Sequence, residues 1–152
     1  KNIDKIIGIE PSVHMQKLSK KKLKGFDVNF ELITERAEEI PLESNSIDSV
    51  VCTYTLCSIS NPQMALSEIR RVLKKDGKFI FTEHAASPDL KINKFQKKIE
   101  PLWKVIADGC HLTRDIKTML AENGFSINNS EDMYLPGTPK FIGYHIWGLL
   151  KK

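Results

Sequence analysis

The sequence predicts an α/β protein with a Rossmann-like open sheet that is mostly parallel and ends in an antiparallel hairpin. Short apolar strand segments alternate with amphipathic helical segments, which is the pattern of parallel strands joined by right-handed crossovers. The last two strand segments are separated only by a Pro-Gly-Thr-Pro turn at 136–139, so no crossover helix joins them. The 152 residues, 41% of them hydrophobic and 28% charged, fit one domain over 1–152 with a real core.

In the first half of the chain, each expected element has a local signal at its end. The apolar segment 3–9 runs into Glu-Pro-Ser, and Gly25 is placed to end the helix that follows. The segment 47–53 is rich in β-branched residues, and Asn61-Pro62 has the residue types of a helix start. We expect that last helix to stop at Asp76-Gly77. The expected order is strand 3–9, helix 13–24, strand 28–33, strand 47–53, and the helix from Asn61.

The second half predicts a strand at 78–82, two helices and the final hairpin. The first helix, 89–103, has apolar residues at helical spacing among lysines. The second, 113–123, begins at Thr113 as its cap and has Gly124 beyond its end. The hairpin strands are expected at 126–134 and 141–150.

Charge and cysteine content exclude several classes of protein. Lys plus Arg is 23 and Asp plus Glu is 19, and this net charge of +4 is too mild for a dedicated nucleic-acid binder. Three cysteines, an odd number, argue against a disulfide framework and favour a reducing, cytoplasmic location. The spacing of Cys and His matches no zinc pattern, so we assign no metal. No apolar run reaches the roughly 18 residues of a membrane span.

Glu10 is the single residue that most clearly indicates a binding site, because it ends an expected buried strand and is followed at once by Pro11-Ser12. An acid there can accept hydrogen bonds from both hydroxyls of a nucleotide ribose. The competing interpretation is a helix-capping acid that stabilises the helix dipole. The glycine loop that normally lies about 20 residues before such an acid would fall upstream of Lys1, so we expect the chain to lack the first strand and helix of the fold.

Three segments carry a family resemblance, and two further segments together with a Glu-His pair narrow it. The chain resembles class I S-adenosylmethionine (SAM)-dependent methyltransferases, most closely the UbiE-like type 11 group, through ERAEEIP at 35–41, NSIDSVV at 45–51 and LSEIRRVLKKDG at 66–77. It is similar to the methyltransferase-like seven proteins, which are thiol S-methyltransferases, through CTYTLCS at 52–58, DGCHLTR at 108–114 and Glu83-His84. The resemblance covers roughly residues 3–150.

The resemblance implies a set of SAM-binding residues. Glu10 would bind the ribose hydroxyls, with Pro11, Ser12 and Met15 flanking the adenosine. Ala37 and Glu38 would hold the adenine, although Arg36 stands where many relatives have an acid that accepts from the adenine amino group. Thr53 and Tyr54 would face the methionine part and the methyl group.

On the acceptor side, the candidates are His84, Cys57, His111 and Arg114. His84 is a candidate catalytic base, because a thiol reacts as its thiolate, while the alternative is a packed structural histidine. For His111 and Arg114 the alternative is a helix N-terminal region, and for Cys57 it is packing. Cys52, in the middle of a strand, is expected to be inert core.

The basic helix at 89–103 has two functional interpretations beside simple packing on its own domain. It is expected either to cover a lipophilic acceptor pocket, where relatives place a lid, or to touch a membrane surface. The lysines at 17–24 are interpreted as a solvated helix end.

The leading hypothesis is therefore a SAM-dependent methyltransferase that acts on a small lipophilic acceptor, with a thiol as the first candidate, and without nucleic-acid partners. Within the same chemistry, the alternative is C-methylation of a quinone precursor. From another class, the alternative is a non-catalytic fragment that acts through interaction, because a sheet without its leading strand exposes edges for pairing.

Overall fold

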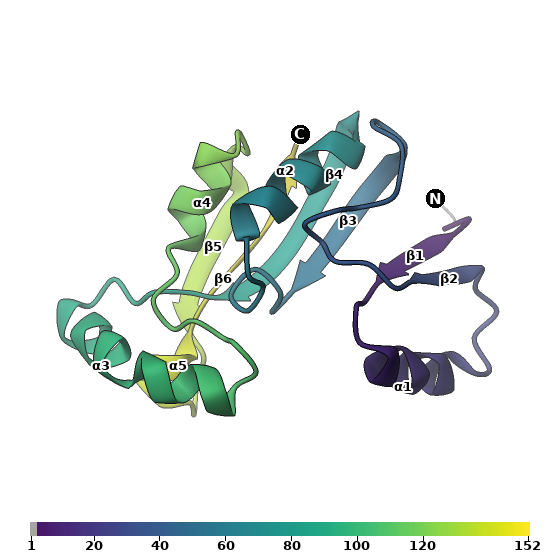
Figure 1. The fold of residues 1–152 in the computed structure, drawn as a ribbon. Helices are drawn as coiled ribbons and strands as arrows, with labels where there is room; N and C mark the ends of the chain where they lie inside the picture. The colour runs from purple at the N-terminus through teal and green to yellow at the C-terminus, as the bar shows by residue number, and fades with distance from the viewer. Residues whose placement is uncertain (1–2) are drawn as a thin grey trace.

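The computed structural model describes residues 3–152 as an α/β fold in which helices and strands alternate along most of the chain (Figure 1). The elements are β1 (Ile6–Ile9), α1 (Val13–Leu23), β2 (Phe30–Ile33), β3 (Ile47–Thr53), α2 (Pro62–Val72), β4 (Leu73–His84), α3 (Leu90–Ile106), α4 (Ile116–Glu122), a 3-10 turn (Ile127–Asn129), β5 (Ser130–Tyr134), α5 (Lys140–Gly143) and β6 (Tyr144–Lys151).

The strands form two sheets, and their pairing confirms the expected fold class. β1 pairs in parallel with β2, and β3 pairs in parallel with β4, each pair being joined by one helix. In the larger sheet, of order β3-β4-β6-β5, β6 runs antiparallel to both neighbours, so β5 and β6 make the expected hairpin. Within residues 3–152, β1 and β3 share no ladder, and the β1–β2 pair stands beside the β3 edge of the larger sheet (Figure 1).

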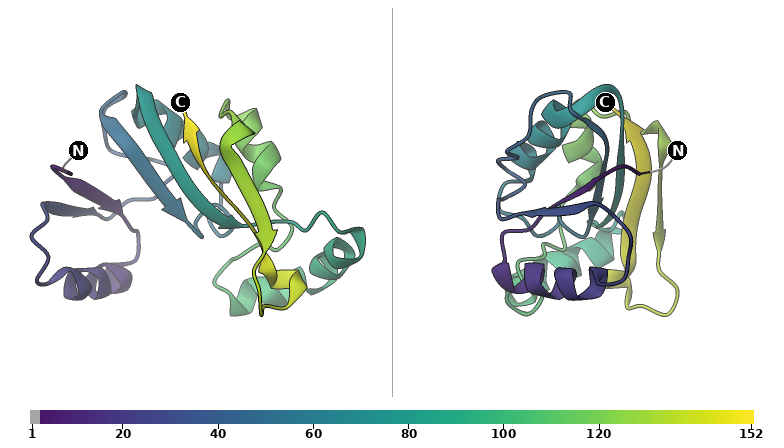
Figure 2. Two further views of the ribbon diagram at one scale, coloured as in Figure 1. Left: turned by 180° about the vertical axis from the view of Figure 1, so that it is seen from behind. Right: turned by 90° about the vertical axis from the view of Figure 1, so that its right-hand side faces the viewer.

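Helices α2 and α4 cover one face of the larger sheet (Figure 2). Apolar residues recur at helical spacing in α2, and its buried side chains pack on the alternating inward residues of β4, of which Phe79 and Phe81 are almost fully buried. Burying such large apolar side chains stabilises a fold by about 1.5–3 kcal/mol each. The opposite sheet face carries exposed apolar side chains, namely Val51, Ile80, Met133 and Leu149.

Short polar side chains start the four longest helices. Ser12, Asn61 and Asp89 each accept a hydrogen bond from a backbone N–H of the first turn, as the sequence predicted for Asn61. The prediction that Thr113 caps the fourth helix is wrong. The helix begins at Ile116, and its cap is Asp115, which accepts a hydrogen bond from Thr118 N at 3.1 Å. Across residues 3–152, none of the helices combines the length and apolar character that crossing a bilayer requires.

The expected helix stop at Asp76-Gly77 is wrong. α2 ends at Val72, and the strand expected at 78–82 begins at Leu73, which is fully buried and is the partner of Ile47 in the parallel ladder. Burial and pairing of Leu73 thus end the helix before the Asp-Gly signal is reached. The register between β3 and β4 shifts after Ile47, and this irregularity accommodates the residues around Gly77.

Other boundaries also moved. The strand expected at 3–9 starts at Ile6, the one at 28–33 starts at Phe30, and α3 continues past residue 103 to Ile106. The expected strands at 126–134 and 141–150 each begin with a helical turn, over 127–129 and 140–143, so the strands themselves start at Ser130 and Tyr144. The hairpin connection is therefore longer than the Pro-Gly turn alone.

Candidate active site

The end of β3 carries a backbone conformation that is unusual for its residue type. Tyr54 follows β3 with φ 52°, in the left-handed region, while its N–H still donates to Thr82 O at 2.9 Å. A bulky residue held there is strained, and such strain collects at functional sites. The side chain of Tyr54 is half exposed and lies edge-on to His145, with ring centroids 5.5 Å apart. Thr53 beside it is exposed.

A buried carboxylate, Glu83, holds the loop that continues from Tyr54. Glu83 lies next to the end of β4 and is fully buried. One carboxylate oxygen accepts from Thr55 N at 3.0 Å, and the other accepts from Cys57 N at 3.1 Å. The thiol of Cys52 donates to the first oxygen at 3.5 Å. The loop after β3 therefore takes its position from one side chain of the neighbouring strand.

His84, the last residue of β4, lies beside this loop with unused hydrogen-bonding capacity. Only 5% of it is exposed, and neither ring nitrogen makes a hydrogen bond of normal geometry within residues 3–152. Its ring stands edge-on to His145 at 5.6 Å between centroids, and His145 in turn contacts Tyr54. Buried polar atoms are normally paired, so an unpaired buried imidazole marks a place where a ligand can bind.

Cys110 brings a second loop to the same place. Contact with Cys57 holds the pKa of the Cys110 thiol below its ordinary value, and His84 and Trp103 lower it further. The indole Nε1 of Trp103 is also buried, and no hydrogen-bond partner for it is described. The same contact and burial raise the pKa of Cys57, whereas burial and the Glu83 carboxylate raise that of Cys52 to about 12. Cys110 is thus the thiol with thiolate character.

Glu100 and Arg114 fasten the two loops to one another and to α3. Glu100 accepts from Thr113 N at 2.8 Å and Thr113 Oγ1 at 2.6 Å, and it lies 3.3 Å from His111 Nδ1. Although burial alone would raise it, the hydrogen bonds from Thr113 hold the pKa of Glu100 below its usual value. Arg114 donates to Leu56 O and, at 2.7 Å, to Ile59 O. Through these contacts His111 and Arg114 help to hold the two loops in place.

The residues expected to bind ribose form a separate group at the carboxyl end of β1. Glu10 accepts from Ser12 N at 2.8 Å through Oε1, which is the helix-start contact of the competing interpretation. Its other oxygen, Oε2, has no partner within residues 3–152, and the residue is partly exposed. Gln16 is buried and donates to Glu10 O at 2.7 Å and Thr34 Oγ1 at 2.8 Å, which ties β1 to β2. Pro11, Ser12 and Met15 are exposed beside it.

The segment after β2 reaches the start of α2. Glu38 accepts from Asn61 N at 3.1 Å, and Arg36 donates to Ser60 Oγ at 3.3 Å. Ala37 lies between them and is partly buried. These bonds bring the segment expected to hold the adenine next to residues 60–61, where the loop after β3 ends.

The structure therefore assembles one cluster that sequence reasoning found only in part. Tyr54, Cys57, His84, His111 and Arg114 were expected and are brought together around the loop after β3. Glu83, Glu100, Trp103 and Cys110 were missed as members of it. In the sequence, Glu83 and Cys110 were marked only as members of the segments that carry the family resemblance, and nothing marked Glu100 or Trp103.

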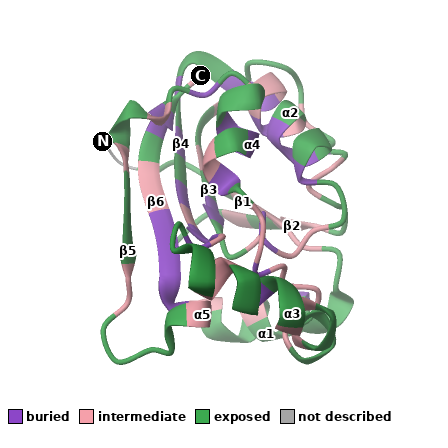
Figure 3. Ribbon diagram, turned by 90° about the vertical axis from the view of Figure 1, so that its left-hand side faces the viewer, coloured by how far each residue is buried: buried purple, intermediate pink, exposed green. Residues whose placement is uncertain are grey.

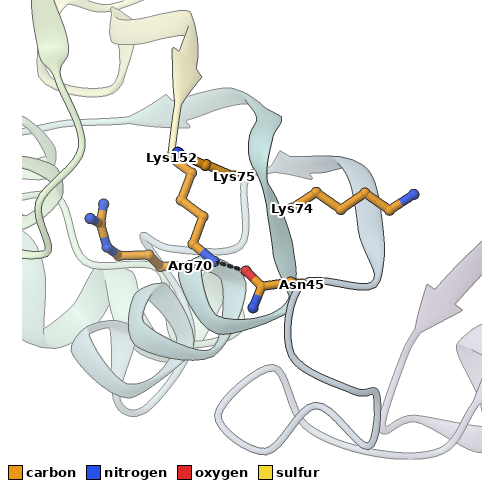
Figure 4. Close-up of a pocket in the computed structure, with 5 residues that line it drawn as sticks. All are labelled: Asn45, Arg70, Lys74, Lys75 and Lys152. Carbon is orange, nitrogen blue, oxygen red and sulfur yellow. Dashed lines mark hydrogen bonds between the residues drawn. The ribbon is translucent and has the colours of Figure 1, made fainter.

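A surface hollow lined by Asn45, Arg70, Lys74, Lys75 and Lys152 lies elsewhere (Figure 4). Its volume is about 640 Å³, and it lies where β4 begins, at the opposite end of that strand from His84. Lys152 Nζ donates there to Asn45 Oδ1 at 2.6 Å, and Lys74 pairs with Asp48 at 2.9 Å. Arg70 and Lys75 complete a lining without a nucleophile or a carboxylate.

Comparison with known proteins supplies the family context. Residues 1–81 match the family described as a methyltransferase domain. The thiol S-methyltransferase TMT1B of Rattus norvegicus is 34% identical over 148 residues, which is 95% of this chain and 61% of the relative. The UbiE ubiquinone/menaquinone biosynthesis C-methyltransferase of Campylobacter jejuni is 41% identical over 83 residues, covering 55% of this chain and 34% of that protein. The chain thus spans about three fifths of the thiol methyltransferase it matches.

A solved structure shows the same fold. A SAM-dependent methyltransferase from Methanosarcina mazei superposes with a TM-score of 0.70 at 17% identity, over 97% of this chain and 82% of its own. At that identity the similarity concerns the fold. It confirms the Rossmann-like architecture expected from the sequence.

We predict that Glu83→Gln lowers the free energy of unfolding by about 1.5–3 kcal/mol, because the amide N–H₂ of glutamine would face a backbone N–H that now has an acceptor. Urea unfolding followed by circular dichroism measures the change. Glu131→Gln, an exposed position on β5, is the matched control and should change it by at most about 0.5 kcal/mol. Equal effects of the two substitutions would contradict the role given to Glu83.

We also predict that iodoacetamide at neutral pH alkylates Cys110 before Cys52 and Cys57, because alkylation requires the thiolate and only Cys110 has a lowered pKa. Peptide mass spectrometry of timed samples measures the order, and the urea-denatured chain should label all three alike. Cys57→Ser should slow labelling of Cys110, while Cys52→Ser should not. Faster labelling of Cys52 or Cys57 would overturn this assignment.

Proposed function

Because the chain belongs to the methyltransferase domain family, we propose that it binds SAM across the carboxyl ends of β1 and β3 and transfers a methyl group from it to a small thiol. Bound SAM supplies a methyl group on a sulfonium that is already activated. The protein's own contribution is then to orient the two reactants for in-line attack and to exclude water.

The residues on the cofactor side fit this ligand. Glu10 Oε2 has no partner within residues 3–152, so the carboxylate can accept from a ribose hydroxyl while Oε1 keeps its bond from Ser12 N. Pro11, Ser12 and Met15 offer an exposed surface beside the ribose, and Ala37 and Glu38 would line the adenine. Thr53 and the strained Tyr54 would face the reacting methyl.

On the acceptor side, we assign a thiol to the space next to His84. The buried imidazole of His84 and the indole N–H of Trp103 make no hydrogen bond of normal geometry within residues 3–152 and both lie next to the Cys110 thiol, so both can take up a polar ligand atom. A thiol placed there would transfer its proton to His84 and attack as the thiolate. Cys57, His111 and Arg114 would complete the wall of this space.

The observation that carries the thiol assignment is the 34% identity to a thiol S-methyltransferase over 95% of this chain. The match covers nearly the whole chain and so both halves of the candidate site, the loop after β3 and the segment 108–114 that bonds to it through His111 N and Cys57 O. The identity to the quinone-precursor C-methyltransferase covers only 55% of the chain. C-methylation of a quinone precursor therefore remains the second candidate.

The substrate class is tested with purified protein, labelled SAM and a panel of acceptors. We expect methylated products from alkyl thiols and none from the matching alcohols, because the thiolate is far more accessible than the alkoxide at neutral pH. A phenolic quinone precursor is the second arm. Methylation of the phenolic precursor without methylation of any thiol would replace the proposed acceptor.

A pair of substitutions separates the cofactor side from the acceptor side. Glu10→Ala should raise the Kd for SAM more than about tenfold, since a hydrogen bond to a charged group contributes about 1.5–3 kcal/mol. His84→Gln should leave that Kd unchanged and lower kcat/KM for the thiol. Calorimetry and initial rates provide the two measurements. An unchanged Kd in Glu10→Ala would show that the ribose lies elsewhere.

A further inference from the structure

Helix α3 presents to solvent a set of large apolar side chains that packing does not explain. Five of its apolar residues are exposed, by 78% for Leu90, 47% for Phe95, 67% for Leu102, 81% for Val105 and 69% for Ile106. Leu102, Val105 and Ile106 follow Pro101 and recur at i, i+3 and i+4, so they lie on one side of the C-terminal part of the helix. A helix face that merely met water would be polar.

The opposite side of the same helix already anchors it to the fold. Gln96 is fully buried; it accepts from Ser87 N at 2.9 Å and donates to Phe141 O at 2.9 Å. Trp103 turns its ring toward Phe141 at 6.1 Å between centroids. Helix α3 and the short α5 lie together at the end of the molecule (Figures 1 and 3). Phe95 also meets Phe141 edge-on, at 5.4 Å between centroids, so the apolar residues that are additional to those holding the helix in place are Leu90, Leu102, Val105 and Ile106.

Lysines surround these apolar residues and carry the charge of the face. Five lysines of α3 are exposed, and none forms an ion pair within 4 Å with another described residue: Lys91, Lys94, Lys97, Lys98 and Lys104. The nearby acids are engaged elsewhere, because Asp89 caps the helix start and Glu100 faces Thr113. Lys140 of α5 adds a further positive charge beside Phe141. We call these ten α3 residues, five apolar and five basic, the basic apolar face.

We propose that the basic apolar face docks on the surface of an anionic lipid bilayer. Leu102, Val105 and Ile106 would enter the boundary between headgroups and acyl chains, and the lysines would reach the negative headgroups with their ammonium ends. Charge complementarity selects this partner, because an apolar stripe flanked by unpaired lysines matches an acyl layer covered by negative charge. This inference does not depend on the proposed methyl transfer.

Vesicle co-sedimentation of the purified 152-residue chain tests the proposal. We expect binding to phosphatidylcholine vesicles that contain phosphatidylserine, at least about tenfold weaker binding to phosphatidylcholine alone, and a marked loss of binding at high salt. Absence of binding to the anionic vesicles, or equal binding to both kinds, would overturn it.

Two substituted proteins locate the contact, and a third is the matched control. L102S/V105S/I106S removes apolar area, and K94E/K98E reverses charge; each should weaken binding to anionic vesicles by about tenfold or more. K75E/K151E makes the same charge change on exposed lysines outside α3 and should have little effect. Circular dichroism and thermal unfolding verify that each variant is folded.

Two further results would overturn the proposal. If K75E/K151E weakens binding as much as K94E/K98E, attraction depends on overall charge and the basic apolar face has no special role. If light scattering shows a dimer that L102S/V105S/I106S dissociates, the face binds a second copy of the chain.

Discussion

The candidate site depends on one buried carboxylate. Glu83 has no contact with solvent. It accepts hydrogen bonds from the backbone N–H groups of Thr55 and Cys57, which lie in the loop after β3. A buried charge is costly unless its hydrogen bonds are satisfied, so the loop can leave this position only by exposing or orphaning the carboxylate. The left-handed Tyr54, one residue before the bonded segment, is held against its own preference by the same attachment.

The second loop, residues 108–114, is held in place by hydrogen bonds to the loop after β3. His111 N donates to Cys57 O at 2.8 Å, and Arg114 reaches the carbonyls on either side of it. Glu100 connects that loop to α3, so the helix, the two loops and the end of β4 form one hydrogen-bonded unit. The unpaired nitrogens of His84 and Trp103 lie inside this unit, and for that reason they are both buried and fixed in place.

Helix α3 contacts the fold with one side and faces solvent with the other. The inner side of α3 carries Gln96 and Trp103 toward the fold, and its outer side carries the basic apolar face. Pro101 lies inside this helix and removes one of its backbone hydrogen bonds, so the part before it, with Gln96, and the part after it, with Trp103, are each attached to the fold by their own contacts. The larger sheet, in contrast, is filled on one face and leaves apolar side chains such as Val51 exposed on the other.

The sequence by itself determined the order of elements, the parallel pairs, the hairpin and the start of α2, because these follow from apolar periodicity and from local capping at residues such as Asn61. It also indicated Glu10 and His84, which stand at strand ends, and Cys57 in the loop after β3. Only the tertiary structure decided where α2 ends, because that depends on burial of Leu73 against another strand. It likewise brought Cys110 and Trp103 to His84, across contacts between residues far apart in the chain that no local pattern records.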